Sequence, residues 1–598
     1  MFSHAGTSSH EVEMTHTPNL QHATNEGSSP ENSSQSLDDT PLQGKRNLNE
    51  VYNATEAMSE QEVRELYAQE GELYLINDEP ESYVEAMVDP NRKKAMDLEL
   101  DSINKNKTWT LVDLPKDHKA IGLKWVFKLK KDAAGKVIKH QARVVAKGYV
   151  QQKGIDFNDA FAPVARLETI WLLLALVAKG NWLVHHLDVK SAFLNGELKE
   201  EVYVTQPSGF EVKEKEHMVY RLHKALYGLR QAPRAWNIKL DTSLKELGFS
   251  RCSQEQVVYK VRKRNSVLIV GVYVDDLIVT VSSKKDIAVF KQKMKAIFDM
   301  SDMGKLSYYL GIEVEQSHEG IVIKQEGYAG KILKMAGKKN SNEAKCPMDH
   351  KLQLTKDGDG KLVDPTEYRK LIGSLRYLLH TRPDLSYSVG YLSKFMQSPK
   401  ECHYAAVKQI LRYLKGTTSY GLRFKKGGDG RLVGYSDSSH GTDKEDGRST
   451  ISIAFYFSGN LITWSSQKQK AVALSSCEAE FMAATSAACQ SLWLRSFISD
   501  LTGKEAEKVL LMVDNESAIA LMKNPVFHGR SKHIDTKYHF IRECVEREQI
   551  EVKHVSGDLQ KADSLTKALP RTQFTEMRDL MGIEDIKSEA NTKGESVG

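Results

Sequence analysis

Two short hydrophobic runs flank a pair of adjacent carboxylates near the middle of the chain. Residues 267–274 and 277–281 are mostly β-branched or aliphatic, and Asp275 and Asp276 lie between them. Runs this apolar predict buried strands. Two acids between them predict a tight hairpin tip, because a buried Asp is costly unless it is paired or bound to a metal. Residues two apart in a strand share a face, so Tyr273 and Asp275 are expected to project together.

Similar patterns predict the other elements of the chain. Apolar residues at helical spacing predict helices over 92–106, 368–380, 403–415 and 473–500. Short apolar runs predict strands over 182–188, 432–437, 449–457, 460–464, 509–514 and 551–555, and a basic hairpin over 121–148 with Gly135 at its turn. This mixture predicts a multidomain protein of α/β and α+β class.

Length and local composition predict the domain boundaries. A chain of 598 residues is too long for one core and predicts three or four domains. Residues 1–82 are polar and poor in aliphatics, so we expect them to be disordered, apart from a short helix over 60–74. The other boundaries are expected at 83–316, 317–428 and 429–570, followed by a C-terminal tail over 571–598, which looks polar from about residue 587.

Charge and cysteine usage narrow the class of protein. The longest apolar run, residues 171–178, is too short to span a membrane, and the polar N-terminus contains no signal-peptide core. Six cysteines without CxxC spacing argue against a disulfide framework and a structural zinc site. We therefore expect an intracellular, soluble protein. Residues 124–153 carry nine Lys or Arg against one acid, a block that suits either phosphate contact or a solvated surface.

Several acids follow predicted strands, and these are the candidates for chemistry. Asp188, Asp437 and Asp514 each end an apolar run, where an Asp is also typical of a turn or a helix cap. Asp275 and Asp276 are adjacent, and two carboxylates 4 Å apart repel by roughly 4 kcal/mol at an effective dielectric of ~20. A divalent cation offsets that repulsion, and oxygen ligands suit Mg²⁺.

The order and spacing of the motifs resemble those of the Ty1/copia-type LTR retrotransposon Pol polyproteins, in their reverse transcriptase and ribonuclease H region. The resemblance covers about residues 83–570. It is carried by Lys124-Trp-Val-Phe-Lys128, Ala142-Arg-Val-Val-Ala-Lys-Gly148, Ala162-Pro-Val-Ala-Arg166, Leu187-Asp-Val-Lys-Ser-Ala-Phe-Leu-Asn-Gly196, Leu226-Tyr-Gly-Leu-Arg-Gln-Ala-Pro-Arg-Ala-Trp236, Tyr273-Val-Asp-Asp276, Ser475-Ser-Cys-Glu-Ala-Glu-Phe-Met-Ala483 and Val513-Asp-Asn-Glu-Ser-Ala518.

This resemblance implies a right-hand polymerase with fingers, palm and thumb, followed by a ribonuclease H-like α/β domain. Residues 317–428 would form the thumb and connection. In the polymerase site, Asp188, Asp275 and Asp276 would hold two Mg²⁺ ions. Gly311 would lie in the primer grip, where a Gly lets the primer backbone approach closely.

The resemblance also implies the contacts to the incoming nucleotide. Arg143 and Lys130 would bind its triphosphate, with Lys131 as an equally suitable register. The Phe193 ring would exclude a ribose 2′-hydroxyl, although an ordinary core Phe is the alternative. Gln231 and Tyr273 would contact the nucleotide as well, whereas Trp236 is expected in the core.

A second two-Mg²⁺ site is implied in the nuclease, formed by Asp437, Glu480, Asp514 and Asp563. Glu478 and Glu480 both flank the apolar stripe of their helix, so periodicity does not separate them. The family pattern Ala479-Glu480-Phe481-Met482-Ala483 favours Glu480. The histidine that some ribonucleases H carry before the last Asp has no match here, since His554 lies too far upstream and Asp558 occupies that loop.

The function implied is an RNA-directed DNA polymerase with ribonuclease H activity. Its partners would be an RNA template, a DNA primer, their RNA–DNA hybrid, dNTPs and other products of the same polyprotein. It would act in the cytoplasm, inside a virus-like particle, or in the nucleus. The alternative is a catalytically silent remnant of an element that only binds nucleic acid.

Overall fold

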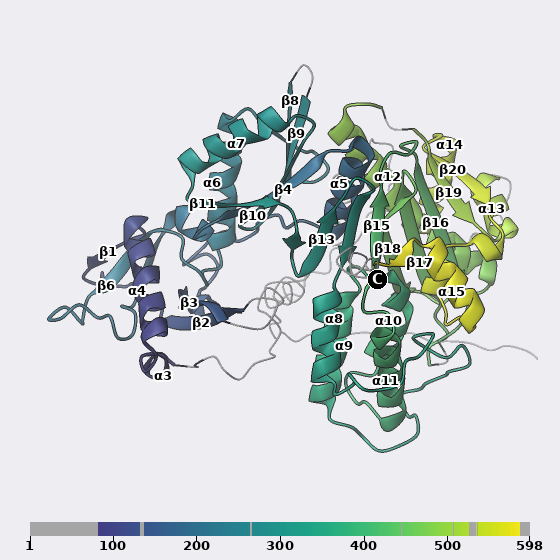
Figure 1. The fold of residues 1–598 in the computed structure, drawn as a ribbon, viewed down its shortest axis with the longest axis horizontal. Helices are drawn as coiled ribbons and strands as arrows, with labels where there is room; N and C mark the ends of the chain where they lie inside the picture. The colour runs from purple at the N-terminus through teal and green to yellow at the C-terminus, as the bar shows by residue number, and fades with distance from the viewer. Residues whose placement is uncertain are drawn as a thin grey trace, which may run out of the picture. The chain divides into compact units, whose positions relative to one another are not determined.

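The computed structural model describes residue 80 and residues 82–586, except 132–136, 264–265, 444, 506, 525–533 and 535. Within this range the chain is mixed α/β, as predicted, with strands in several separate sheets (Figure 1). The predicted disorder of residues 1–82 and the helix over 60–74 fall almost entirely outside the described residues and stay predictions.

The first described segment builds a small sheet, a hairpin and two helices. Helix α4 (Pro90–Lys105) begins at Asp89, whose side chain accepts a hydrogen bond from Asn91 N, with Pro90 in the first turn. It packs on β3. The strands are β1 (Trp109–Val112), β6 (Val219–Lys224) and β5 (Glu197–Val204) in one sheet, and the predicted basic hairpin, β2 (Leu123–Lys131) with β3 (Val137–Ala146).

A six-stranded sheet carries the central hairpin. Its order is β11 (Met300–Lys305), β4 (Leu183–Val189), β10 (Asp276–Val281), β9 (Ser266–Tyr273), β8 (Val258–Lys263) and β7 (Ser250–Arg251). The helices associated with it are α5 (Leu167–Gly180), α6 (Ala232–Glu246) and α7 (Lys284–Ile297). Both flanks of the carboxylate pair are therefore central strands, which explains their uninterrupted apolar sequence.

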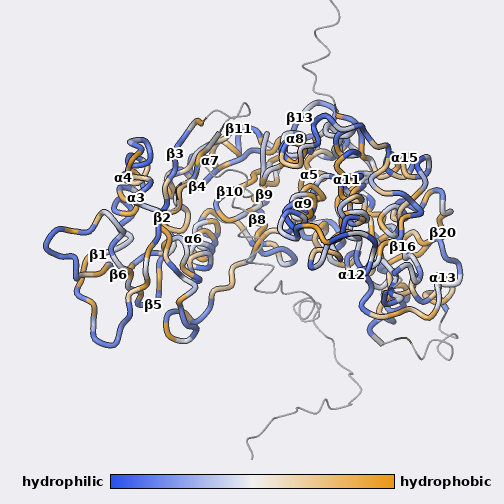
Figure 2. The backbone as a smooth tube through the Cα atoms, turned by 90° about the horizontal axis from the view of Figure 1, so that it is seen from below, coloured by the Kyte–Doolittle hydropathy of each residue, from blue (hydrophilic) through white to orange (hydrophobic). Residues whose placement is uncertain are grey.

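Helix α5 is hydrophobic on every side, and residues 169–178 are all buried. A helix that is apolar all round must be covered all round. It contacts β4 of the six-stranded sheet. It also contacts strands of two further sheets, namely β14 (Gly320–Lys324), β15 (Tyr420–Lys425) and β18 (Asn460–Lys468). Figure 2 shows this helix among the hydrophobic segments of the interior. The run noted as too short for a membrane span is thus a shared core helix. Among the described residues, no helix is long and apolar enough to cross a membrane.

A third group of elements follows residue 306. One sheet contains β12 (Tyr308–Tyr309), β13 (Ile312–Gln316), β14 (Gly320–Lys324), β15 (Tyr420–Lys425) and β21 (Ile583–Asp585). Beside it lie α8 (Glu326–Met335), α9 (Pro365–Leu378), α10 (Ser386–Ser393) and α11 (Glu401–Lys415), which share one hydrophobic core (Figure 1). The helices expected over 368–380 and 403–415 are confirmed.

The prediction of a C-terminal tail over residues 571–598 is wrong for residues 571–586. Residues 571–586 fold as α15 (Arg571–Leu580) and β21, and β21 pairs with β15. Phe574, Met577 and Met581 are buried at helical spacing, so the sequence contained the signal. Residues 587–598 lie outside the described range.

The last sheet has the order β18 (Asn460–Lys468), β17 (Thr450–Phe457), β16 (Leu432–Ser439), β19 (Val509–Val513) and β20 (Ile550–His554). Strands β16, β19 and β20 are parallel, whereas β17 and β18 form an antiparallel meander. Helix α12 (Ser476–Thr502) packs on β16, and α13 (Glu516–Lys523) and α14 (Phe540–Glu546) complete this region.

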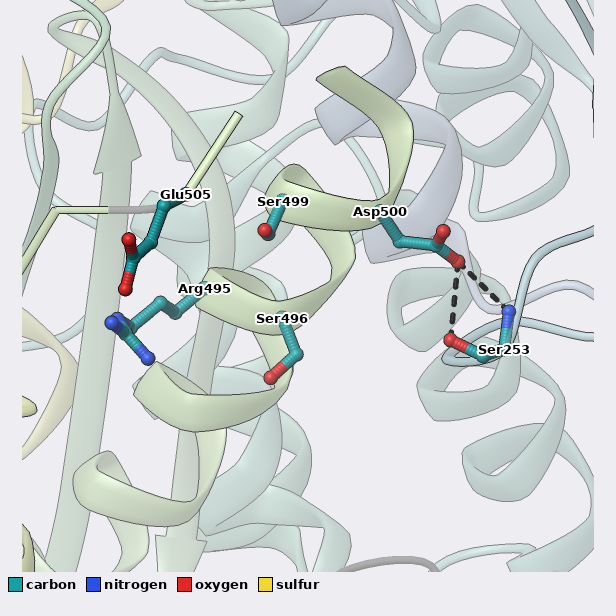
Figure 3. Close-up of a pocket in the computed structure, with 6 residues that line it drawn as sticks. All are labelled: Ser253, Arg495, Ser496, Ser499, Asp500 and Glu505. Carbon is teal, nitrogen blue, oxygen red and sulfur yellow. Dashed lines mark hydrogen bonds between the residues drawn. The ribbon is translucent and has the colours of Figure 1, made fainter. Parts of the chain in front are cut away.

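The C-terminal end of α12 is anchored by residues from the six-stranded sheet and the loop beside it. The Asp500 carboxylate accepts hydrogen bonds from Ser253 N at 2.8 Å and from Ser253 Oγ at 3.2 Å (Figure 3). Lys260 and Arg262 also donate to this last turn, where cations are favoured. Beside these contacts lies a polar cavity of about 310 Å³, lined by Ser253, Arg495, Ser496, Ser499, Asp500 and Glu505.

Candidate active sites

The β9–β10 hairpin presents the carboxylate pair on a two-residue turn. Tyr273 pairs with Asp276, so Val274 and Asp275 form the turn between the strands. Val274 has φ of 53°, a left-handed conformation that is strained for a β-branched residue. The prediction that Tyr273 and Asp275 project together as neighbours on one strand face is wrong in its premise, because Asp275 is a turn residue.

The strand register places Asp188 opposite Asp276. Asp188 on β4 is the direct antiparallel partner of Asp276 on β10. The backbone N–H of Val189 donates to Asp275 O at 2.9 Å, which ties the turn to the same strand. Asp188, Asp275 and Asp276 thus lie at the same end of the neighbouring strands β4 and β10.

Trp236 is hydrogen-bonded to this turn. Its side chain is buried, as predicted, and its Nε1 donates a hydrogen bond of 2.6 Å to the carbonyl oxygen of Val274. That bond fixes the strained residue directly before Asp275. Trp236 is therefore a positioning residue that the sequence did not reveal, although a tryptophan needs a partner for its N–H when it is buried.

His186 occupies one oxygen of Asp276. The His186 Nε2 atom lies 2.6 Å from Asp276 Oδ1, and the imidazole meets the edge of the Tyr309 ring. Tyr309 in turn contacts Tyr273 edge to face. Asp276 is thereby oriented by a neighbour in the same way as the carboxylate ligands of many metal sites, which are themselves hydrogen-bonded.

Two of the predicted nucleotide contacts converge on one tyrosine. The Arg143 guanidinium lies 4.6 Å from the centre of the Tyr227 ring, and the Phe193 ring lies 4.9 Å from it. Burial raises the pKa of Tyr227, with Arg143 opposing and the charges of Asp275 and Asp188 adding to the increase. Tyr227 thus lies between the basic hairpin and the acids. Nothing in the sequence distinguishes Tyr227 within its motif, because its contacts with Arg143 and Phe193 join residues far apart along the chain.

The Gln231 side chain is held inside the protein, and its contact with the nucleotide stays a prediction. Its side chain is only 2% exposed, and both ends of its amide are engaged. The oxygen accepts from Gln151 Nε2 at 3.1 Å, and the nitrogen donates to Asp156 O at 3.1 Å. Gln231 therefore fastens the loop after the basic hairpin. The side chains of Lys130 and Lys131 lie outside the described residues, so the choice between them stays open.

The close approach expected at Gly311 has an internal cause. Gly311 has φ of 73°, and a Cβ at this position would lie 2.1 Å from Tyr377 Oη. The same hydroxyl donates to Leu310 O at 2.5 Å. Glycine is required here by α9 itself, whatever else approaches the β12–β13 turn.

The second set of acids gathers on the last sheet. Asp437 on β16, Glu480 on α12 and Asp514 after β19 form the acidic cluster, whose ligand oxygens lie within 4.8 Å of one another. Among the described residues, it is the one group of three such side chains that meets this distance. The parallel order of β16 and β19 brings the ends of these strands together, so both acids lie at the same edge.

The geometry distinguishes Glu480 from Glu478. Glu480 Oε1 accepts from Ser438 N at 2.8 Å, which points its carboxylate at β16. Glu478 Oε2 accepts instead from Leu474 N at 2.8 Å, and Glu478 N donates to Ser475 Oγ. Glu478 is therefore part of the helix cap. Capping geometry separates two residues that periodicity left equal.

The electrostatics of the acidic cluster favour a bound cation. Burial, followed by the charges of neighbouring acids, raises the pKa of Asp437 to about 6, and burial raises the pKa of Asp514. Burial, followed by the charges of Asp437 and Asp514, holds the pKa of Glu480 well above its usual range. Glu480 Oε2 is buried and, in the described part of the chain, has no hydrogen-bond donor beside it. A carboxylate oxygen in this position fits a divalent cation.

The fourth predicted acid lies beside the cluster and has a lysine partner. Asp563 is buried, and its charge contributes to the raised pKa of Asp437. Lys567 Nζ lies 2.5 Å from Asp563 Oδ1, and Thr566 Oγ1 donates to Asp437 Oδ2 at 2.8 Å. His554, which seemed too distant in sequence, ends β20, and its charge acts to lower the pKa of Asp514.

Comparison with known proteins shows the family to which the chain is similar. A family described as reverse transcriptase (RNA-dependent DNA polymerase) matches residues 106–350. The retrovirus-related Pol polyprotein from transposon TNT 1-94 of Nicotiana tabacum is 40% identical over 527 residues, which cover 86% of this chain and 40% of that protein. The corresponding polyprotein from transposon RE1 of Arabidopsis thaliana is 38% identical over 85% of this chain and 35% of its own length.

A shorter relative is covered almost completely. The putative transposon Ty5-1 protein of Saccharomyces cerevisiae is 34% identical over 302 residues, which make up 98% of that protein and 50% of this chain. The chain contains a reverse transcriptase family domain. It belongs to the Ty1/copia-type retrotransposon Pol polyproteins, and it spans less than half the length of the two plant relatives.

Proposed function

We propose that this chain is an RNA-directed DNA polymerase that also carries ribonuclease H activity. The observation that supports the polymerase most directly is the pairing of Asp188 with Asp276 beside the Asp275 turn. Two acids from hydrogen-bonded strands and a third from the adjoining turn form a site suited to two-metal nucleotidyl transfer. In this proposal the six-stranded sheet is the palm, the basic hairpin belongs to the fingers, and residues 317–428 form the thumb and connection.

Asp188 and Asp275 would hold the metal ions of the polymerase site. Asp276 would support them through the oxygen that His186 leaves open, since the other oxygen is hydrogen-bonded. When bound, two Mg²⁺ ions supply Lewis-acid activation of the attacking oxygen and charge to stabilise the leaving group, here and in the nuclease. Trp236 keeps Asp275 in place through the Val274 carbonyl.

Arg143, Tyr227 and Phe193 would receive the nucleotide. Arg143 is half-buried against the Tyr227 ring, which orients its planar fork for a triphosphate. Phe193 packs on the same Tyr227 ring, so its own ring has a fixed position from which it would exclude a 2′-hydroxyl. In this proposal Phe193 makes the sugar contact and Tyr227 supports it, while the predicted contact of Gln231 stays a prediction.

The acidic cluster, together with Asp563, would cleave the RNA strand of the hybrid. Asp437, Glu480 and Asp514 would hold the metal ions. When bound, these ions would activate water for attack on an RNA phosphodiester. Thr566 orients Asp437 by a hydrogen bond to one of its oxygens. An RNA–DNA hybrid would be recognised mainly through its backbone and 2′-hydroxyls.

Exchanging one acid at a time tests the two-site proposal. Asp275→Asn keeps the side-chain shape and removes a metal-binding charge, so extension of a DNA primer should stop on RNA and DNA templates while cleavage of labelled RNA in a hybrid continues. Asp437→Asn should give the converse result, and each variant is the matched control for the other. Loss of both activities in a folded Asp275→Asn protein would contradict the assignment of separate sites.

A further inference from the structure

Lys567 supplies a positive charge inside the candidate nuclease site. Its Nζ contacts Asp563 Oδ1 at 2.5 Å, one helical turn along the chain. The Asp563 side chain is 6% exposed, whereas the Lys567 side chain is 48% exposed. The carboxylate is therefore fixed in the protein, and the lysine approaches it from the solvent side on a flexible stem.

The same lysine acts on the rest of the site. Burial opposes its charge, but the bond to Asp563 and the charges of Asp437 and Asp514 raise the pKa of Lys567 overall. Its charge in turn acts to lower the pKa of both Asp437 and Asp514. The preceding residue, Thr566, is hydrogen-bonded to Asp437, so the backbone that carries Lys567 is fixed to the cluster.

We propose that Lys567 is a resident cation of the nuclease site, which competes with a divalent metal ion for Asp563 and so sets the metal affinity of the site. This rests on the proposed nuclease function. A metal ion that uses Asp563 must displace the ammonium group from Oδ1, and the exposed stem allows the group to swing outward. Lys567 is a positioning residue: its contact with Oδ1 holds the Asp563 carboxylate in place until the metal binds.

The competition gives an effect opposite to that of an ordinary structural residue. Removing a structural contact loosens a site and weakens binding. Removing a competing cation should strengthen metal binding, because Asp563 no longer has to exchange partners. One charge-assisted hydrogen bond corresponds to about a tenfold change in affinity, and this is the increase expected for Lys567→Met.

The test is Mn²⁺ titration calorimetry of the full chain, with Asp275→Asn in every protein so that the polymerase acids contribute less. Lys567→Met should bind Mn²⁺ about tenfold more tightly than the lysine parent, and Lys567→Arg should resemble the parent. Lys561→Met is the matched control. Lys561 Nζ lies over the Tyr456 ring at 4.3 Å and makes no described bond to Asp563, so its loss should change affinity less than twofold.

Hybrid cleavage gives the second readout. Lys567→Met should reach half-maximal cleavage at a lower Mg²⁺ concentration, with the rate at saturating Mg²⁺ retained. Unchanged or weaker Mn²⁺ binding by Lys567→Met would overturn the proposal for Lys567 alone, provided that the parent cleaves hybrid. If the folded parent neither binds Mn²⁺ nor cleaves, the proposed nuclease function fails, and the role of Lys567 falls with it.

Discussion

Replacing Arg382 by Met should destabilise the helical region around α9, α10 and α11. The Arg382 side chain is 2% exposed and that of Asp384 is fully buried, and the two form a bidentate pair with bonds of 3.0 and 2.7 Å. Arg382 also donates to Thr417 O and Thr417 Oγ1. Removing one partner of a buried pair leaves an uncompensated charge and costs about 3–5 kcal/mol.

The reasoning predicts a specific rescue. Asp384→Asn removes the charge that Arg382→Met leaves without a partner. The new amide can still accept a hydrogen bond from the Tyr413 hydroxyl, which lies 2.8 Å from Asp384 Oδ2 in the native protein. The double variant should therefore be more stable than Arg382→Met alone. Arg431→Met is the control, because the Arg431 side chain is 70% exposed and its ion pairs are long, so its loss should cost less than about 0.5 kcal/mol.

Hydrogen exchange followed by mass spectrometry measures the effect locally. Peptides from α9, α10 and α11 should exchange faster in Arg382→Met by the factor that the lost opening free energy implies. Exchange at wild-type rates, or a double variant less stable than Arg382→Met, would refute the claim that the stranded Asp384 charge is the cause.

Four other outcomes are expected. Phe193→Val should raise the kcat/KM ratio of rGTP to dGTP on one primer–template, and an unchanged ratio in an active variant would return Phe193 to the core. The pKa of Asp437 is raised to about 6 from its usual value near 4. Between about pH 4 and pH 6 the carboxyl of the native protein therefore keeps a proton that the unfolded chain has released. Stability of the metal-free protein should thus fall as pH rises from about 4 to 6, and Mg²⁺ uptake at pH 6 should release protons, as calorimetry in two buffers would show. Deleting residues 1–82 should change extension by no more than a few-fold, and loss of folding would refute the expected disorder.

The sequence predicted those features that depend on short-range pattern. Apolar runs located β9, β10, β16 and β19, and helical spacing located α11 and α12, because burial on one face imposes a period on the chain. Helix capping, which pattern alone does not show, separates Glu478 from Glu480. Pattern alone also does not show the Trp236 contact with Val274, or the position of Tyr227 between Arg143 and Phe193. Each of these contacts joins residues that are far apart in sequence.

Gln231 illustrates what a motif leaves open. It stands in a motif that resembles a substrate loop, but a motif does not tell which side chains turn inward, and Gln231 satisfies both ends of its amide inside the protein. The error over residues 571–586 has a physical cause, because this segment holds six charged and six apolar residues, so its composition alone does not distinguish a tail from a folded element. Three buried side chains at the right spacing were enough to fold it.

The central claim is tested most directly by incubating the purified full chain with a labelled DNA primer on an RNA template, dNTPs and Mg²⁺. The account predicts extension of the primer to the end of the template, dependent on the divalent cation. A folded protein that binds the primer–template and adds no nucleotide would contradict it, and would favour a silent remnant that only binds nucleic acid.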